Sequence, residues 1–346
     1  MPPGADGPAN RKLTVALDGR GAEKGTDVLV KGAVLAMNDG IAVRVFGDLE
    51  ELAPLGEAGA QVVAAPGEIT NEEDPVAAVR SGEDASVVMA AADVAEGRSD
   101  ALVSAGPTGA TMAAALFALR RLSGVRRPAL AVQLVVPGRE GPPTLLLDVG
   151  ANADARSQDL VQWAVMGSAF SQAVLGVAQP RVALLSVGEE AKKGTFQVVE
   201  AHAELLGLQG IEFVGNVEGR DLLTGKADVI ATEGFTGNVA LKTLEGTAKA
   251  VGAAVGSAAR SNPISALGGL LLRPALGGLR REMDPDTVGG AILLGVRGVA
   301  VVGHGSSGPN GIANAIRLAA RAVSERGVER TGELLVSAGA TRVALK

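Results

Sequence analysis

The sequence predicts an α/β protein built on a largely parallel, doubly wound sheet. Short aliphatic runs alternate along the chain with alanine-rich segments of helical length and spacing, and this alternation is typical of βα units. Most of the aliphatic runs are continuously apolar, as expected of strands that are buried on both faces. The 48 glycines are scattered between these runs, which favours many tight turns from strand to helix.

Ten strands are expected, at Leu13–Leu17, Ala42–Phe46, Gln61–Ala65, Ala101–Ala105, Ala129–Val136, Thr144–Val149, Arg181–Val187, Glu212–Asn216, Val229–Thr232 and Val299–Gly303. Helices are expected between them at Thr26–Met37, Asp84–Gly97, Thr108–Leu119, Ser157–Leu175 and Pro309–Val323. No internal repeat and no linker divides the chain, so we predict a single α/β domain over residues 11–346. Residues 237–284 form a helical excursion from that domain, with a break at Ser261–Pro263 between two helices.

The composition excludes several classes of protein. The chain has no cysteine and only two histidines, which excludes disulfides, thiolate metal sites, a cysteine nucleophile and a histidine-rich metal site. A net charge of −6 argues against a general nucleic-acid binder. The polar start, Met1–Asn10, has no apolar segment of a signal peptide. We therefore expect a cytoplasmic protein that needs no metal.

Five turns rich in glycine and small polar residues are the candidate ligand-binding segments. They are Asp18–Gly21, Ser104–Gly109, Asp148–Asn152, Glu233–Asn238 and His304–Ser307, and four of them directly follow a predicted strand. Ligands of open α/β sheets bind beyond the carboxyl ends of strands, and exposed N–H groups at helix starts bind anions. A simple helix cap explains any one of these turns alone, but we expect the five to lie at one edge of the sheet and to hold a phosphate.

The nucleotide-binding patterns that use similar turns are broken. Gly19 and Gly21 begin a dinucleotide fingerprint, but Lys24 stands where the third glycine belongs. No glycine-lysine pair completes a phosphate-binding loop of the nucleotide triphosphatase type. In the charged run Gly188–Thr195 the lysines either reach a phosphate or form solvated surface, and His304 is either a turn residue or a donor to an anion.

Seven short segments, in this order, match the pattern of one family: Glu72–Arg80 (EEDPVAAVR), Ser104–Ala110 (SAGPTGA), Leu147–Asp154 (LDVGANAD), Gly188–Gly194 (GEEAKKG), Gly215–Asp221 (GNVEGRD), Gly234–Lys242 (GFTGNVALK) and His304–Ala319 (HGSSGPNGIANAIRLA). From about Leu13 to Val323 the chain resembles the phosphate acyltransferases of bacterial phospholipid synthesis (the PlsX family). It departs from that family's pattern at Gly19–Glu23, at Ser81–Glu83, at Pro107 and at Glu233. The resemblance implies a Rossmann-like three-layer sandwich, a homodimer and peripheral contact with the inner face of the membrane.

The implied reaction moves a fatty acyl group from the thioester of acyl carrier protein to inorganic phosphate. Phosphate is itself the nucleophile and the leaving thiol has a pKa near 8.5, so neither a protein nucleophile nor a cofactor is required. The expected roles are as follows: Ser104, Gly106, Thr108, Gly109, Ser306 and Ser307 bind the phosphate; Lys193 neutralises its charge; Asn216, Asn238 and His304 donate to the thioester carbonyl or the phosphate; and Asp18, Asp148 and Asn152 orient the loops.

The helical excursion carries an apolar group beside arginines. Its expected contact residues are Leu267, Leu270, Leu271, Arg273, Arg280 and Arg281, a combination that suits either an interfacial segment facing anionic head groups or an acidic carrier, or a dimer interface. The resemblance also implies a downstream glycerol-phosphate acyltransferase as a partner. A membrane-associated regulator without catalysis and a nicotinamide-dependent oxidoreductase of related fold stay open as alternatives.

Overall fold

One mixed sheet of eleven strands forms the centre of the protein, in the order β3-β2-β1-β4-β11-β10-β5-β6-β9-β7-β8. The structure is a computed structural model, and it describes residues 12–282 and 284–345. The strands are β1 Thr14–Asp18, β2 Ala42–Gly47, β3 Gln61–Ala64, β4 Ala101–Ser104, β5 Ala129–Leu134, β6 Thr144–Leu147, β7 Arg181–Leu185, β8 Glu212–Val217, β9 Val229–Ala231, β10 Ala291–Leu294 and β11 Val299–Val302. Ten of them match the predicted strands to within two residues.

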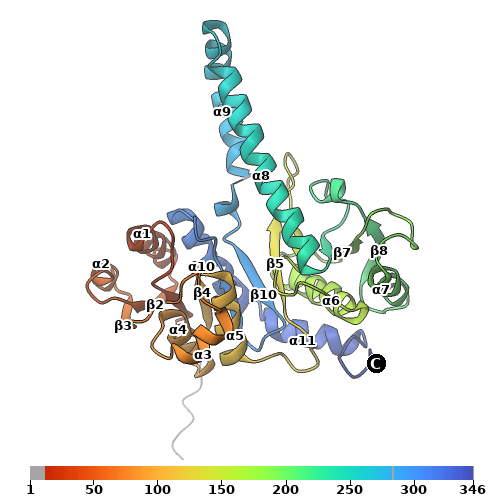
Figure 1. The fold of residues 1–346 in the computed structure, drawn as a ribbon, viewed down its shortest axis with the longest axis horizontal. Helices are drawn as coiled ribbons and strands as arrows, with labels where there is room; N and C mark the ends of the chain where they lie inside the picture. Colours follow the sequence, from red (N-terminus) through yellow and green to blue (C-terminus); the bar gives the residue numbers. More distant parts are fainter. Residues whose placement is uncertain (1–11, 283, 346) are drawn as a thin grey trace, which may run out of the picture.

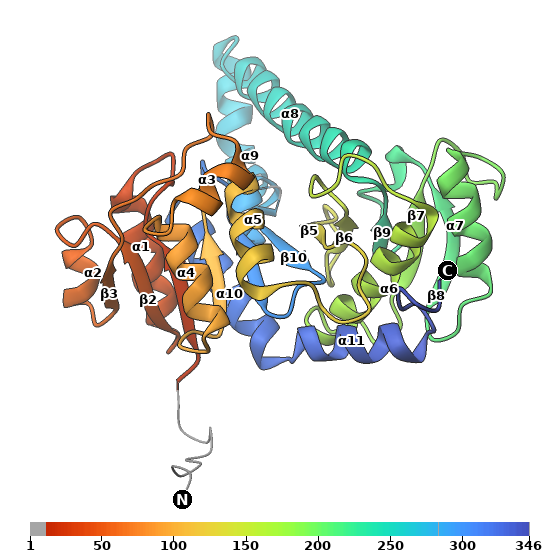
Figure 2. The ribbon, with the colours of Figure 1, turned by 60° about the horizontal axis from the view of Figure 1, so that its bottom comes forward.

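Helices cover both faces of this sheet (Figures 1 and 2), so the predicted three-layer α/β architecture is confirmed. They are α1 Thr26–Met37, α2 Ala53–Glu57, α3 Pro75–Ser81, α4 Ser86–Ala95, α5 Thr108–Leu119, α6 Ser157–Ala173, α7 Phe196–Leu206, α8 Gly234–Ala259, α9 Pro263–Glu282, α10 Pro309–Ser324 and α11 Gly327–Ser337. Helices α3, α4 and α5 pack on one face, and α1, α2, α6, α7, α10 and α11 pack on the other. The first turns of α8 cover the face opposite α6 and α7.

The sequence did not reveal strand β10, and a reversal of strand direction within the sheet changes the geometry of the candidate site. β10 runs antiparallel to both β11 and β5, and β5 runs antiparallel to β6. Strands β6, β9, β7 and β8 therefore run opposite to β1, β4 and β11. The expectation that all five glycine-rich turns share one edge of the sheet is wrong, because the two turns that follow β6 and β9 end at the edge where β4 and β11 begin.

Helices α8 and α9 project together from the body as a hairpin (Figure 1), and they lie within the range 237–284 expected for the helical excursion, apart from the first residues of α8. Its turn falls at residues 260–262, and Gly269 of α9 leaves room for Ala259 of α8. Leu267, Leu270 and Leu271 are 61%, 62% and 74% exposed, so the expected apolar contact group faces solvent in this chain. Arg273 is exposed as well, whereas the side chains of Arg280 and Arg281 lie outside the described residues. In the described parts of the chain no helix has the length and apolar character to cross a membrane.

A partly buried ion pair joins Arg181, at the start of β7, to Asp228, the residue before β9. The Arg181 guanidinium donates to both carboxylate oxygens of Asp228, at 2.9 and 2.8 Å, and the Arg181 backbone N–H donates to the same group at 2.9 Å. Burial by itself raises the pKa of Asp228, but the hydrogen bonds and the charge of Arg181 outweigh it and hold the pKa below its ordinary value of 3.8. The ionised form of Asp228 therefore stabilises the fold.

We expect Asp228→Asn to lower the free energy of unfolding by about 2 kcal/mol near neutral pH, because the donors of Arg181 lose a charged acceptor. Since the pKa of Asp228 is lower in the folded protein, this stabilisation is present above pH 3.8 and is lost as the pH falls through the folded-state pKa. Urea unfolding of both proteins between about pH 7 and pH 3 measures the difference. Asp154→Asn is the control, because Asp154 is 89% exposed beside Arg127 and is expected to matter by less than about 1 kcal/mol. Equal costs for the two variants, or a difference that does not depend on pH, would contradict the assignment.

Candidate active site

Three of the glycine-rich turns meet beyond the carboxyl ends of β1, β4 and β11. The Glu23 N–H donates to the Gly305 carbonyl at 3.1 Å, which joins the first turn to the last. Gly21 has a φ of 79°, and a Cβ there would lie only 2.8 Å from the Cα of Gly106. Glycine is therefore required where the first turn packs on the backbone of the second. This arrangement brings together the turns that the sequence assigns to phosphate, and we call it the first group.

A buried hydrogen-bond network holds the first group in shape. The Asp18 carboxylate accepts from the hydroxyls of Ser86 at 2.6 Å and Ser104 at 2.7 Å. Burial raises the pKa of Asp18, and these hydrogen bonds oppose the rise. The Ser104 hydroxyl also accepts from the Gly106 N–H at 3.0 Å and lies 3.0 Å from the Thr111 hydroxyl. Ser104 is fully buried with its hydrogen-bonding capacity used, so it supports the turn in place of the direct phosphate contact expected from the sequence.

The start of α5 is the part of the first group whose backbone N–H groups are left unpaired among the described residues. No side chain caps this helix, and within the described parts of the chain the N–H groups of Thr108, Gly109 and Ala110 have no acceptor. The start of α10 is different, because the Gly308 N–H donates to the Asp286 carboxylate at 2.7 Å. A carboxylate already satisfies that helix dipole. Within the described chain, the start of α5 is thus the helix start in the first group that has neither a side-chain cap nor a neighbouring carboxylate on its N–H groups.

The turn after β11 adds side-chain donors. His304 Nδ1 accepts from the Ser306 N–H at 3.2 Å and lies 2.9 Å from the Ser306 hydroxyl. A neutral His304 therefore carries its proton on Nε2, which is left as a donor. Ser306 is exposed, whereas Ser307 is 6% exposed and its N–H donates to the His304 carbonyl at 2.8 Å. Of the two serines, Ser306 is the one placed to meet a ligand.

The second group begins with the turn after β6, which lies directly under the start of α8. The Asp148 carboxylate is fully buried and accepts from the N–H groups of Leu130, Gly150, Ala151 and Asn152 and from the Asn152 side chain. Burial raises the pKa of Asp148 against these hydrogen bonds. A Cβ at Gly237 would lie 1.9 Å from the Asp148 carbonyl oxygen. Asp148 and Asn152 are thus joined to each other and to the turn by hydrogen bonds. Asn238 stands exposed on the first turn of α8.

The loop between β7 and α7 lies at the same edge of the sheet, because β7 and β6 both run parallel to β9, and we include it in the second group. Lys193 is exposed on it, and the Ser186 hydroxyl donates to the Lys193 carbonyl at 2.9 Å. Asn216 is only 4% exposed, and its side-chain amide donates to the Glu190 carbonyl at 3.1 Å while its oxygen lies 2.9 Å from His202 Nδ1. Both ends of the Asn216 amide are thus engaged within the protein. Asn216 therefore holds the loop that carries Lys193, whereas the sequence led us to expect that it contacts the substrate.

The structure separates the predicted residues into these two groups. The first group contains Thr108, Gly109, Ser306 and His304, and the second contains Lys193 and Asn238. Among the described residues no hydrogen bond joins the two groups. The sequence did not single out Ser86, Thr111, His202 or Asp286, because a lone serine, threonine, histidine or aspartate in a helix or short turn carries no pattern of its own.

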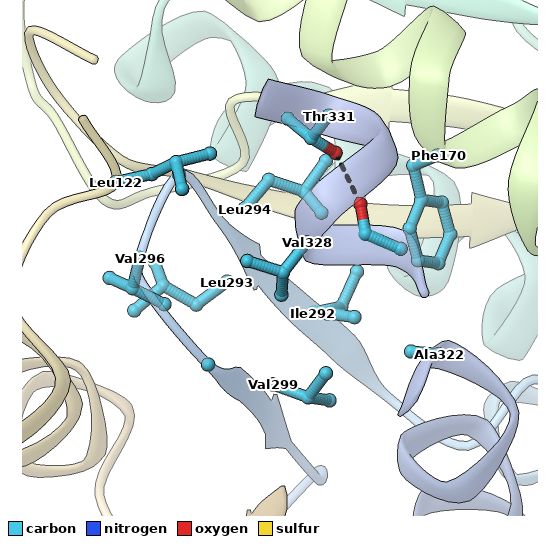
Figure 3. Close-up of a pocket in the computed structure, with 13 residues that line it drawn as sticks. Leu122, Phe170, Ile292, Leu293, Leu294, Val296, Val299, Ala322, Val328 and Thr331 are labelled. Carbon is cyan, nitrogen blue, oxygen red and sulfur yellow. Dashed lines mark hydrogen bonds between the residues drawn. The ribbon is translucent and has the colours of Figure 1, made fainter. Parts of the chain in front are cut away.

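An apolar pocket lies away from both groups, between β10, α6 and α11 (Figure 3). It has a volume of about 20 Å³ and is lined by residues such as Phe170, Ile292 and Leu294. The hydroxyl of Thr331, which also faces it, already donates to the Gly327 carbonyl at 2.6 Å. A space of that size holds about one water molecule, so this pocket is not the anion site. No cluster of potential metal ligands occurs within residues 12–282 and 284–345.

Comparisons with known proteins agree with the resemblance seen in the sequence. The family described as "Fatty acid synthesis protein" matches residues 13–330. A phosphate acyltransferase of Elusimicrobium minutum is 47% identical over 319 residues, covering 90% of this chain and 92% of the relative. A phosphate acyltransferase of Heliobacterium modesticaldum is 43% identical over 321 residues, covering 90% of this chain and 95% of the relative.

Solved structures support the fold at much lower sequence identity. A phosphotransacetylase from Streptococcus pyogenes is 16% identical with a TM-score of 0.58, over 91% of this chain and 94% of that one. A 4-hydroxythreonine-4-phosphate dehydrogenase from Klebsiella pneumoniae is 15% identical with a TM-score of 0.51, over 89% and 98%. These likenesses show the architecture alone, and the sequence relatives decide the family. The chain belongs to the fatty acid synthesis protein family and, within it, to the phosphate acyltransferases.

Proposed function

We propose that this protein transfers a fatty acyl group from the thioester of acyl carrier protein to inorganic phosphate. A phosphate oxygen attacks the thioester carbonyl carbon, the carbon–sulfur bond breaks, and the products are an acyl phosphate and the free thiol of the carrier. The departing thiolate takes its proton from phosphate or solvent. The observation that carries the proposal is the uncapped start of α5, whose N–H groups have no acceptor among the described residues and lie beside the His304 turn. The chain belongs to the phosphate acyltransferases, and an anion such as phosphate fits these donors.

The chemistry asks for positioning and charge stabilisation, which are what these residues offer. Holding two reactants together and stabilising the developing oxyanion each contribute several orders of magnitude in rate. In the proposed site the N–H groups of Thr108 and Gly109 and the Ser306 hydroxyl bind the phosphate, and His304 donates from Nε2. Asp18 and Ser104 hold this turn in shape without touching substrate.

The second group supplies the remaining charge in this proposal. Lys193 neutralises the phosphate and Asn238 donates to the thioester oxygen, because both side chains are exposed and neither forms a hydrogen bond or ion pair within the described residues. The two groups face one substrate only if they approach each other, so we propose that substrate binding draws them together, as closure does in many enzymes. The exposed leucines of α9 with Arg273 then face a membrane surface or the acidic carrier.

The exposed surface of α9 also bears on where the protein acts. We place the protein in the cytoplasm as a homodimer, in peripheral contact with the inner face of the membrane, handing its product to a glycerol-phosphate acyltransferase. An acyl phosphate hydrolyses in water, so delivery close to the consuming enzyme protects it. The exposed apolar side chains at Leu267, Leu270 and Leu271 support such a contact.

One assay tests the reaction. The protein is incubated with a long-chain acyl thioester of acyl carrier protein, with and without phosphate, and free carrier thiol and acyl phosphate are both measured. We expect thiol release that depends on phosphate and an equal amount of acyl phosphate. Absence of release with retained binding to anionic liposomes would point instead to a non-catalytic protein at the membrane.

A further inference from the structure

The Asn216 amide has a defined orientation because its two ends meet different partners. Its nitrogen donates to the Glu190 carbonyl at 3.1 Å, so its oxygen is the atom that lies 2.9 Å from His202 Nδ1. An amide oxygen can only accept. His202 Nδ1 must therefore carry a hydrogen, which it does in the protonated imidazole as well as in one neutral tautomer.

A bulge in β8 creates this contact. The pairing of β8 with β7 shifts between Val182 and Ala183, so that one extra residue stands opposite β7, and Gly215 has a φ of 96° there. In a regular strand the side chains of Phe213 and Asn216 would point to opposite faces. The extra residue places both against His202, since the Phe213 ring meets the imidazole edge-on at 5.0 Å while Asn216 forms the hydrogen bond.

The backbone carbonyl of Glu190 connects Asn216 to Lys193. This carbonyl oxygen accepts from the Lys193 N–H at 2.9 Å and also from the Asn216 side chain, so both lone pairs of the oxygen are used. The Ser186 hydroxyl holds the Lys193 carbonyl from the other side. Both backbone groups of Lys193 are thus tied down while its side chain is exposed, and His202 and Asn216 fix one of the two anchors.

We propose that His202 is a positioning residue for the lysine-bearing loop. Its Nδ1–H sets the Asn216 amide, the amide nitrogen sets the Glu190 carbonyl, and that carbonyl sets the backbone at Lys193. His202 touches no substrate. The inference rests on the proposed function in one respect, namely the role of Lys193 in binding phosphate. Amide hydrogen exchange tests the chain of hydrogen bonds without reference to activity.

Three single variants separate this hydrogen bond from ordinary packing. His202→Leu keeps most of the side-chain volume and removes the donor, whereas His202→Asn places an amide nitrogen near the position of Nδ1. Phe213→Leu is the matched control, because it removes the other contact of the imidazole and leaves the hydrogen bond. We expect His202→Leu to raise the KM for phosphate about tenfold, with a smaller change in kcat, as a displaced binding group does. His202→Asn should recover most of this loss, and Phe213→Leu should stay within about twofold of the parent.

Two further measurements decide how the effect is transmitted. In a Lys193→Ala background, His202→Leu should change kcat/KM by less than about twofold, because the residue through which it acts is gone. Amide hydrogen exchange should show the Lys193 N–H exchanging at least about tenfold faster in His202→Leu than in the parent. This second readout holds whether or not the protein transfers acyl groups.

The proposal is overturned if His202→Leu exchanges at the parental rate at Lys193, or if it lowers kcat/KM by the same factor with and without Lys193. It is also overturned if Phe213→Leu reproduces the loss, since packing would then suffice. A parent protein without phosphate-dependent thiol release would remove the proposed function, and the exchange rates would still decide the role of His202.

Discussion

Lys193→Ala is expected to lower kcat/KM for phosphate by about 100-fold or more, with no loss of stability. A cation beside a reacting phosphate stabilises charge that water would otherwise have to solvate. Removing one such group lowers kcat by roughly two to three orders of magnitude in comparable sites. The side chain is exposed, and none of the described carboxylates pairs with its ammonium group. Folding therefore does not depend on it. Steady-state kinetics with varied phosphate, together with urea unfolding, measures both quantities.

The neighbouring Lys192 provides the control. It is exposed on the same loop, so Lys192→Ala removes the same charge from the same region and leaves the Lys193 side chain in place. We expect its kcat/KM to stay within about threefold of the parent, as is usual for a surface charge. Equal losses of kcat/KM in the two variants would show that the overall positive charge of the loop matters and not Lys193 in particular. Parental activity in Lys193→Ala would show that Lys193 has no role in the reaction.

Gly237→Ala is expected to have the largest effect on the fold of the site. The added Cβ would lie 1.9 Å from the Asp148 carbonyl oxygen and 3.0 Å from Thr232 Cγ2, so the start of α8 has to move off the turn after β6. Forcing atoms into a packed site costs about 1 to 3 kcal/mol and occasionally more, and here the obstacle is backbone. We expect a loss of about 3 kcal/mol in the free energy of unfolding and at least about 100-fold in kcat/KM, because Asn238 moves with the helix.

A second glycine of the same helix isolates the steric cause. A Cβ at Gly246 meets no atom within 4 Å, and the residue is exposed. Gly246→Ala should therefore stabilise the protein by about 0.5 to 1 kcal/mol through helix propensity, and leave kcat/KM unchanged. If Gly237→Ala also leaves the free energy of unfolding and kcat/KM undiminished, the close approach of α8 to Asp148 does not contribute to stability or activity.

Much of the fold was readable from local patterns. The helices at Thr26–Met37 and Thr108–Leu119 begin and end where predicted, because their boundaries are set by neighbouring glycine, proline and polar residues. The helical hairpin was recognised from its Ser-Asn-Pro break. Strand β10 was missed, since four apolar residues between glycines do not distinguish a strand from a buried turn. Its bounding glycines, Gly290 and Gly295, have φ values of 102° and 91°, which only the folded backbone reveals.

The candidate site was readable in its parts but not in its assembly. The sequence by itself determined the α/β class and the resemblance to phosphate acyltransferases, which the comparisons confirm. That the glycine-rich turns bind an anion stays a prediction. Tertiary structure decided that these turns form two groups, because the antiparallel pairing of β5 with β6 reverses β6, β9 and β7 relative to β4 and β11. Pairing direction is set by contacts between distant segments. It also decided that Ser104 and Asn216 face inward to Asp18 and His202. Such roles depend on what surrounds a side chain in space, and that depends on packing across the whole sheet.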